Sequence, residues 1–288
     1  MIQWYYLAII AAIFTAVSTL TEKYALNKEH ATQYSASVSV VSFLFSLAFI
    51  PFISFTNLNP YAILVIYILS IFAAWNFLVS ARLYRHSSIS MSTPTVNTLP
   101  NVFIAIIAFF FLDEKLKPFQ YASIAILIIA TYLMFITGRK SIWGKVKGSY
   151  IRLLINSALT AAISWVIIKY VLNLGVNPVL LLLLSQGFIA LNMVIFMQFK
   201  FGGLSEIGKM VKKYPLALLS SGVSMVLYRI LLFWALVTAE VSIAFPLRGA
   251  IFIILTVLCG SIFFKEENLV KRILLAMVMI AASYILVL

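Results

Sequence analysis

Long apolar runs alternate with short polar segments along the whole chain. Each run is about 20 residues long, which is the length an α-helix needs to cross the hydrocarbon core of a bilayer. Inside lipid the backbone must satisfy its own hydrogen bonds, so each run is predicted to be a helix. Ten spans are predicted, at residues 4–23, 34–55, 60–82, 89–112, 118–137, 150–170, 178–199, 215–237, 241–264 and 269–288.

The second half of the chain repeats the first. Four residues recur in order, 152 positions later: Ser90, Pro94, Phe111 and Glu114 correspond to Ser242, Pro246, Phe263 and Glu266. The collinear matches predict two homologous halves, 1–138 and 150–288, joined by a basic linker at 139–149. Five spans is an odd number, so the second half must enter the membrane from the other side. The predicted fold class is an all-α integral membrane protein with ten transmembrane helices in two inverted five-helix repeats.

Composition agrees with a lipid environment, since 64% of the residues are hydrophobic and only 10% are charged. The net charge of +13 would suggest nucleic acid binding in a soluble protein. Here the basic residues lie mostly between the apolar runs, so lipid headgroups are the expected partners and no nucleic acid is expected. Counting the residues at the helix ends, sixteen of the 21 lysines and arginines lie on one face of the membrane, and the opposite face holds only Lys115 and Lys117. The positive-inside rule then predicts a cell-membrane protein with both termini outside the cytoplasm.

Polar residues inside the spans are costly and are therefore informative. Thr93, Asn97 and Asn101 are spaced by four residues and share one face of a helix. Asn76 and Ser164 are further polar residues within spans. Two amides one turn apart need hydrogen-bond partners, which a water-filled cavity would supply. A serine-rich stripe in span 34–55 fits close helix packing and a cavity wall equally well.

Spans 118–137 and 269–288 differ from the others because they are almost wholly apolar. Such helices face lipid or a second copy of the chain. A homodimer through these two spans is therefore one of two expected arrangements.

Arg229 is the most informative single residue, because it lies near the middle of a span. A guanidinium left in lipid costs about 3 to 17 kcal/mol, so Arg229 must face a cavity, a carboxylate or a bound anion. Arg248, about two turns into its span, faces the same cavity or extends toward the headgroups. We expect the side chains of Lys23 and Lys169, near the ends of equivalent spans, to extend toward the headgroups.

Three prolines interrupt predicted helices, namely Pro94, Pro100 and Pro246. A proline within a membrane helix frees a carbonyl and permits bending, which alternating access would use, although a static kink is the other interpretation. Trp75, Trp165 and Trp234 lie deep enough in their spans to line a cavity or to pack in the core.

Together these features resemble a known family. Each half closes with a proline-bearing span, an apolar run, an acidic residue and a further apolar span, as in the EamA-like branch of the drug/metabolite transporter superfamily. The residues that carry the resemblance are Pro94 and Pro100 through Phe111, Leu112, Asp113 and Glu114, and Pro246 through Phe263, Phe264, Lys265 and Glu266. The chain departs from the pattern at Phe252, the counterpart of Pro100. Relatives also keep their termini in the cytoplasm, against the charge bias of this chain.

The resemblance implies a central cavity lined by spans 1–4 and 6–9, with spans 5 and 10 peripheral. Members of the family move amino acids, nucleotide-sugars, phosphorylated sugars, amines and other metabolites by rocking one bundle against another. The two arginines, with no carboxylate at the centre of a span, favour an amino acid or small organic anion. The residues predicted to bind it are Arg229, Arg248, Tyr228, Asn97, Asn101, Asn76, Trp75, Trp165, Ser164 and Thr93. The alternatives are a carrier of amines or drugs, a carrier of nucleotide-sugars or phosphorylated sugars, a channel and a scramblase.

An enzyme is not expected, because the chain lacks the residues that membrane-embedded catalysis needs. It has only two histidines, His30 and His86, and a single Cys259. It contains no HExxH, GxSxG or Asp-rich motif, so no metal ion or cofactor is expected.

Overall fold

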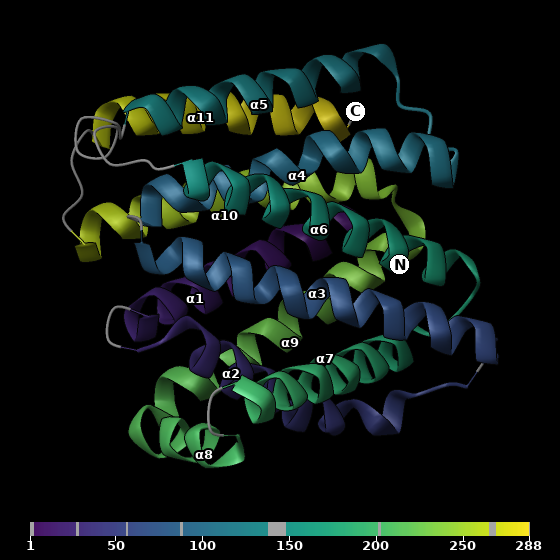
Figure 1. Ribbon diagram of the computed structural model, residues 1–288. Coiled ribbons are helices and arrows are strands. Elements are labelled where there is room, and N and C mark those ends of the chain that lie inside the picture. Colours follow the sequence, from purple (N-terminus) through teal and green to yellow (C-terminus); the bar gives the residue numbers. More distant parts are fainter. Residues whose placement is uncertain are drawn as a thin grey trace.

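The computed structural model describes residues 3–26, 29–55, 57–86, 89–137, 148–200, 203–264 and 269–287. Over these ranges the regular structure is helical (Figure 1). The helices are α1 (Trp4–Leu26), α2 (Ala31–Ser46), the 3-10 helix η1 (Leu47–Phe52), α3 (Pro60–His86), α4 (Ile89–Leu112), α5 (Pro118–Thr137), α6 (Gly148–Asn173), α7 (Pro178–Lys200), α8 (Leu204–Lys213), α9 (Pro215–Thr238), α10 (Val241–Phe264) and α11 (Leu269–Val287).

Seven helices of the described chain are long and apolar enough to cross a membrane. They are α1, α2 continued by η1, α3, α6, α7, α9 and α10. Two shorter apolar stretches, Val96–Leu112 and Pro118–Ala130, belong to α4 and α5. Large apolar side chains such as Phe199 and Leu216 lie exposed on the outer surface, as expected for helices that face lipid. The prediction of an all-α integral membrane protein is therefore confirmed, and the count of ten spans stays a prediction.

Proline sets where four of these helices begin. α3, α5, α7 and α9 each start at a proline, whose missing N–H would have no helical partner at that position. Asparagine completes two of these starts. The Asn59 side chain accepts a hydrogen bond from the Ala62 N–H at 2.7 Å, and Asn177 accepts bonds from Val179 and Leu180 at 2.8 and 3.2 Å.

The helices pack in pairs that agree with a two-fold repeat. α1 packs against α9 and α10, and α6, its counterpart in the second half, packs against α3 and α4. α5 and α11 lie together at one edge of the bundle (Figure 1). Alanines at 8, 11, 12 and 16 are buried and let neighbouring backbones approach α1 closely. The linker predicted at 139–149 falls largely outside the described residues, so the division into halves stays a prediction.

Lys23 and Lys169, at equivalent places in the two predicted halves, make the same kind of contact. Lys23 donates a hydrogen bond to the Tyr84 carbonyl at 2.7 Å, and Lys169 donates one to the Leu236 carbonyl at 2.8 Å. Tyr84 and Leu236 are themselves 152 positions apart, which is the spacing of the repeat. Both lysines are buried, so the expectation that they extend to the headgroups was wrong. The carbonyls at the ends of α3 and α9 lack helical partners and can accept these bonds.

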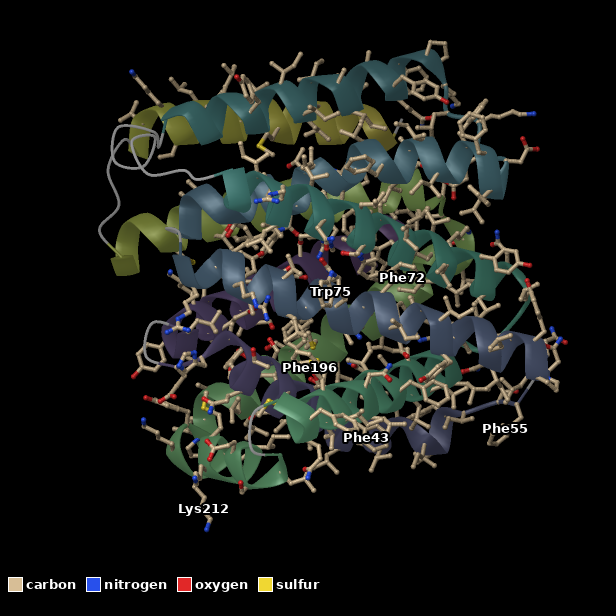
Figure 2. All side chains as sticks on the ribbon, in the orientation of Figure 1. Phe43, Phe55, Phe72, Trp75, Phe196 and Lys212 are labelled. Carbon is tan, nitrogen blue, oxygen red and sulfur yellow. The ribbon has the colours of Figure 1, made fainter. Side chains whose placement is uncertain are left out.

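Two features depart from the predicted spans. The second span is an α-helix only as far as Ser46, and η1 with Pro51 inside it continues to Phe52. The amphipathic helix α8 was not predicted. It buries Ile207 and Met210 against the bundle, while Lys212 points away from it (Figure 2). A basic helix of this kind lies at the membrane surface rather than across the bilayer.

Candidate functional site

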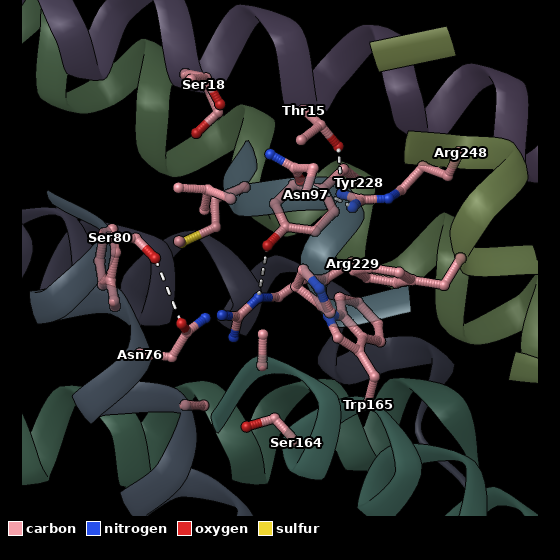
Figure 3. Close-up of a pocket in the computed structure, with 18 of the residues that line it drawn as sticks. Thr15, Ser18, Asn76, Ser80, Asn97, Ser164, Trp165, Tyr228, Arg229 and Arg248 are labelled. Carbon is pink, nitrogen blue, oxygen red and sulfur yellow. Dashed lines mark hydrogen bonds between the residues drawn. The ribbon is translucent and has the colours of Figure 1, made fainter. Parts of the chain in front are cut away.

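A cavity of about 140 Å³ lies inside the bundle, between α1, α3, α4, α6, α7, α9 and α10 (Figure 3). One water needs roughly 10–15 Å³ of such volume, so the cavity holds several waters or a small solute. None of its described lining residues comes from α5 or α11, as the resemblance implied. None comes from α2 either, and on this point the expectation was wrong.

The serine stripe of α2 packs against α9 instead of facing the cavity. The Ser42 hydroxyl donates to the Gly222 carbonyl at 3.4 Å, and the Tyr34 and Ser221 hydroxyls are 2.6 Å apart. A Cβ added at Gly222 would come within 2.7 Å of the Val41 side chain. Of the two interpretations of the stripe, close helix packing is therefore the one the structure supports.

Arg248 projects from α10 into the cavity and is only 3% exposed. Its guanidinium donates to the Asn97 side-chain oxygen at 3.2 Å and to the Thr15 hydroxyl at 3.4 Å. The guanidinium carbon lies 4.4 Å from the centre of the Phe245 ring, within the range of a cation–π contact. Its Nε has no partner within the described chain. This buried cation therefore has only neutral neighbours among its hydrogen-bond acceptors.

Arg229 reaches the same cavity from α9. It donates to the Gln186 side-chain oxygen at 3.0 Å. It also donates to the Tyr228 hydroxyl at 3.4 Å (Figure 3). The ion pairs of the described chain involve neither Arg229 nor Arg248. Two guanidinium groups in one low-dielectric cavity make it strongly attractive to an anion.

Two asparagines are held in place around the arginines. Asn97 donates to the Thr93 carbonyl at 3.0 Å and to the Tyr84 hydroxyl at 3.4 Å, which orients its oxygen toward Arg248. The Asn76 oxygen accepts hydrogen bonds from Ser80 at 3.3 Å and from Ser157 at 2.9 Å. Asn76 thereby joins α3 to α6 at the edge of the cavity.

Most of the residues selected from the sequence line this cavity. They are Arg229, Arg248, Tyr228, Asn97, Asn76, Trp165, Ser164 and Pro100. Thr93 and Asn101 are instead buried within the packing of α4. Trp75 and Trp234 are each 46% exposed and face away from the cavity. The Trp75 indole donates to the Asn156 side chain at 2.7 Å, which leaves its ring at the surface of the bundle (Figure 2).

The other two prolines lie within helices near the site. Pro246 is buried inside α10, two residues before Arg248, and Pro94 belongs to the backbone of α4. The roles of Pro94, Pro100 and Pro246 in bending stay predictions.

Glu22 also lines the cavity, although it was not among the residues predicted to bind the solute. It is the one carboxylate among the described lining residues. The signal was present in the sequence, because Thr15, Ser18 and Glu22 are spaced by three and four residues and therefore share one face of α1. No group of three or more His, Cys, Asp or Glu side chains that could hold a metal ion was found in the described ranges.

Glu114 caps the start of α10, the helix that carries Arg248. Its carboxylate accepts hydrogen bonds from the backbone N–H groups of Val241 and Ser242 at 2.9 and 3.1 Å, and from the Ser242 hydroxyl at 2.6 Å. A negative charge at a helix N-terminus is favoured by the helix dipole. In the adjoining loop, burial together with the Glu114 charge raises the pKa of Glu240, against the opposing effect of Lys169.

Comparison with known proteins gives a family match for residues 2–136 and a similar fold for nearly the whole chain. Residues 2–136 match the EamA-like transporter family. A solved structure described only as "Crystal structure of protein" superposes with a TM-score of 0.68, at 13% identity, covering 98% of this chain and 95% of its own. At that identity the similarity concerns the fold alone. No curated protein matches the sequence.

Proposed function

We propose, from the match of residues 2–136 to the EamA-like transporter family, that this chain is a transporter of that family and carries a small metabolite with a carboxylate group, an amino acid or small organic anion, across the membrane. The carrier works by alternating access and needs no ATP. The solute binds in the cavity between the helices, with Arg229 and Arg248 as its anion-binding groups.

One observation carries the proposal: two arginines line one buried cavity, and the acceptors they bind are neutral. A buried guanidinium is stable only when something offsets its lost hydration. A carboxylate does so best, because it accepts two parallel hydrogen bonds from the planar guanidinium. Arg248 still has Nε without a partner and is therefore able to form one more bond.

The volume and lining of the cavity narrow the solute class. A volume of about 140 Å³ lies below the roughly 300–1,000 Å³ of pockets for drug-sized ligands. It therefore favours a small metabolite over a nucleotide-sugar. Two cations disfavour an amine without an anionic group. Trp165, Phe233 and Phe245 supply an apolar wall for the rest of the solute.

The arrangement of the helices is suited to opening toward either face. Each predicted half places a proline in a cavity-forming helix, α4 and α10, where bending moves lining residues. We further propose that the protein lies in the cell membrane, with α8 and its lysines on the cytoplasmic face and both termini outside. Accessibility of a C-terminal tag in intact cells tests this orientation, and a tag reached only after permeabilisation would reverse it.

Counterflow in proteoliposomes tests the transport proposal. Vesicles loaded with unlabelled amino acids or organic acids should accumulate the labelled solute saturably, which a channel or scramblase would not do. Arg229→Ala and Arg248→Ala should abolish this uptake, while the matched surface change Lys212→Ala should leave it intact. Unchanged transport of every anionic candidate by both arginine variants would refute the proposal.

A further inference from the structure

We infer that Glu22 is a second pole of the substrate site and binds an ammonium group, so that the cavity fits an elongated zwitterion. Such a solute carries its carboxylate at one end and an amine several methylenes away, as in ω-amino acids and basic amino acids. The inference rests on the proposed function and specifies its substrate class.

The surroundings of Glu22 call for a cation. The side chain is 7% exposed, lines the cavity, and has one carboxylate oxygen without a hydrogen-bond partner in the described chain. By contrast, three other acidic residues of the described chain form ion pairs with a lysine within 4.0 Å, namely Glu29, Glu206 and Asp113. A buried carboxylate without a counter-ion is strongly unfavourable. An ammonium group of the solute would supply the missing charge and the missing donor.

The two poles are separated along α1. Thr15, Ser18, Thr19 and Glu22 all line the cavity and follow one face of the helix. Thr15 accepts a hydrogen bond from Arg248, so it fixes the position of the cationic pole. Glu22 lies seven residues further along α1, so the backbone positions of Thr15 and Glu22 are about 10 Å apart along the helix axis at 1.5 Å per residue. The neighbouring ammonium and carboxylate of a simple α-amino acid do not span that distance, whereas a chain of several methylenes does.

The apolar part of the cavity lining suits such a chain. Phe77, Val96 and Met225 line the cavity and offer apolar contacts for methylenes. The Tyr84 hydroxyl lies beside them and accepts a hydrogen bond from Asn97, which itself binds Arg248. Arg248, Asn97 and Tyr84 thus form a connected series of polar contacts that extends from the cationic pole. Charges of opposite sign at two ends of one cavity would also fix the orientation of a zwitterion.

Binding of three compounds of equal chain length to the purified protein tests the inference. 6-Aminohexanoate has both charged groups, hexanoate has only the carboxylate, and hexylamine has only the ammonium. We expect 6-aminohexanoate to bind at least about tenfold more tightly than either of the others, measured by calorimetry or by ligand-induced thermal stabilisation. Equal affinity for 6-aminohexanoate and hexanoate would overturn the inference while leaving the proposed function intact. If none of the three binds, both fail.

Substitution of Glu22 locates the effect. Glu22→Gln should remove the preference for 6-aminohexanoate and leave hexanoate affinity unchanged, whereas Glu22→Asp should retain part of the preference. Glu29→Gln, which makes the same change just beyond the end of α1, is the matched control. An equal loss for both ligands would show a purely structural role for Glu22. Loss of proton-driven uptake with the ligand preference intact would instead make Glu22 a proton site, and either result overturns the inference.

Discussion

Replacing Arg248 by methionine should stabilise the empty protein, or leave its stability unchanged, while destroying solute binding. Methionine has a similar length and no charge, so it can fill the space without a buried cation. Arg248 is 3% exposed, and its hydrogen bonds of 3.2 and 3.4 Å end on neutral oxygens. This combination is expected where a charge is kept for binding rather than for folding.

The magnitude follows from those contacts. Burying the guanidinium costs at least about 3 kcal/mol. Its two long hydrogen bonds return about 1–2 kcal/mol together, and its contact with the Phe245 ring returns about 1 kcal/mol. Arg248→Met should therefore raise the free energy of unfolding by at least about 0–1 kcal/mol, which corresponds to a melting temperature unchanged or raised by a few degrees. Loss of a buried charge partner for the solute should weaken its binding by about 2–4 kcal/mol, or roughly 30- to 1,000-fold.

Thermal unfolding in detergent, with and without solute, measures both effects in one experiment. The wild-type protein should melt at a higher temperature when the solute is added, and Arg248→Met should not respond to it. Arg248→Lys, which keeps the charge but not the planar donors, should respond weakly. A clear fall in the melting temperature of empty Arg248→Met, with its solute response retained, would show that Arg248 serves the fold and would refute the reasoning.

Three further predictions concern the fold around the site. Gly222→Ala should lower the melting temperature by forcing α2 away from α9, at about 1–3 kcal/mol, whereas Gly208→Ala, which meets nothing within 4 Å, should raise it slightly. Glu114→Gln should cost about 1–3 kcal/mol of stability because three donors at the start of α10 lose a charged acceptor; an unchanged melting temperature would show that this contact is dispensable. The hydrogen bond from Lys213 lowers the pKa of Glu29. The contact between the two residues therefore stabilises the fold fully above the ordinary carboxyl pKa near 4.3, and this stabilisation is lost as the pH falls through the lowered pKa. Melting curves between about pH 3 and 6 should show this loss in the wild type and not in Lys213→Met, and identical pH profiles would contradict it.

The sequence predicted the helices and the position of Arg229 because both follow from the cost of polarity in lipid. A run of apolar residues leaves no alternative to a helix, and proline determines where several of the helices start. An arginine in the middle of a span can be stable only beside a cavity, an anion or an acidic partner. Arg229 indeed lines the cavity, and its place in the span was enough to predict this.

The rotation of each helix about its own axis could not be predicted in the same way. Trp75 and Asn76 are neighbours in the sequence, yet one lies at the outer surface and the other lines the cavity. Which face of α3 turns inward depends on α6 and α7, which lie more than 60 residues further along the chain. The serines of α2 were ambiguous for the same reason, since a small polar residue suits a tight helix contact as well as a wet cavity. The helix α8 was not predicted because it lies between two spans and is too short and too polar to be recognised as a span.

Both arginines of the site belong to the predicted second half, and this asymmetry bears on how an anionic group would be held. Val96 and Arg248 are 152 positions apart, so they are counterparts, and both line the cavity. The counterpart of Asn97, which binds Arg248 at 3.2 Å, is Gly249. Arginines at both positions would repel each other by about 4 kcal/mol at a 4 Å separation. The second half instead supplies the cation and the first half supplies the amide that orients it. In the proposed carrier, a carboxylate held by Arg248 should therefore stay on α10 whichever face the cavity opens to.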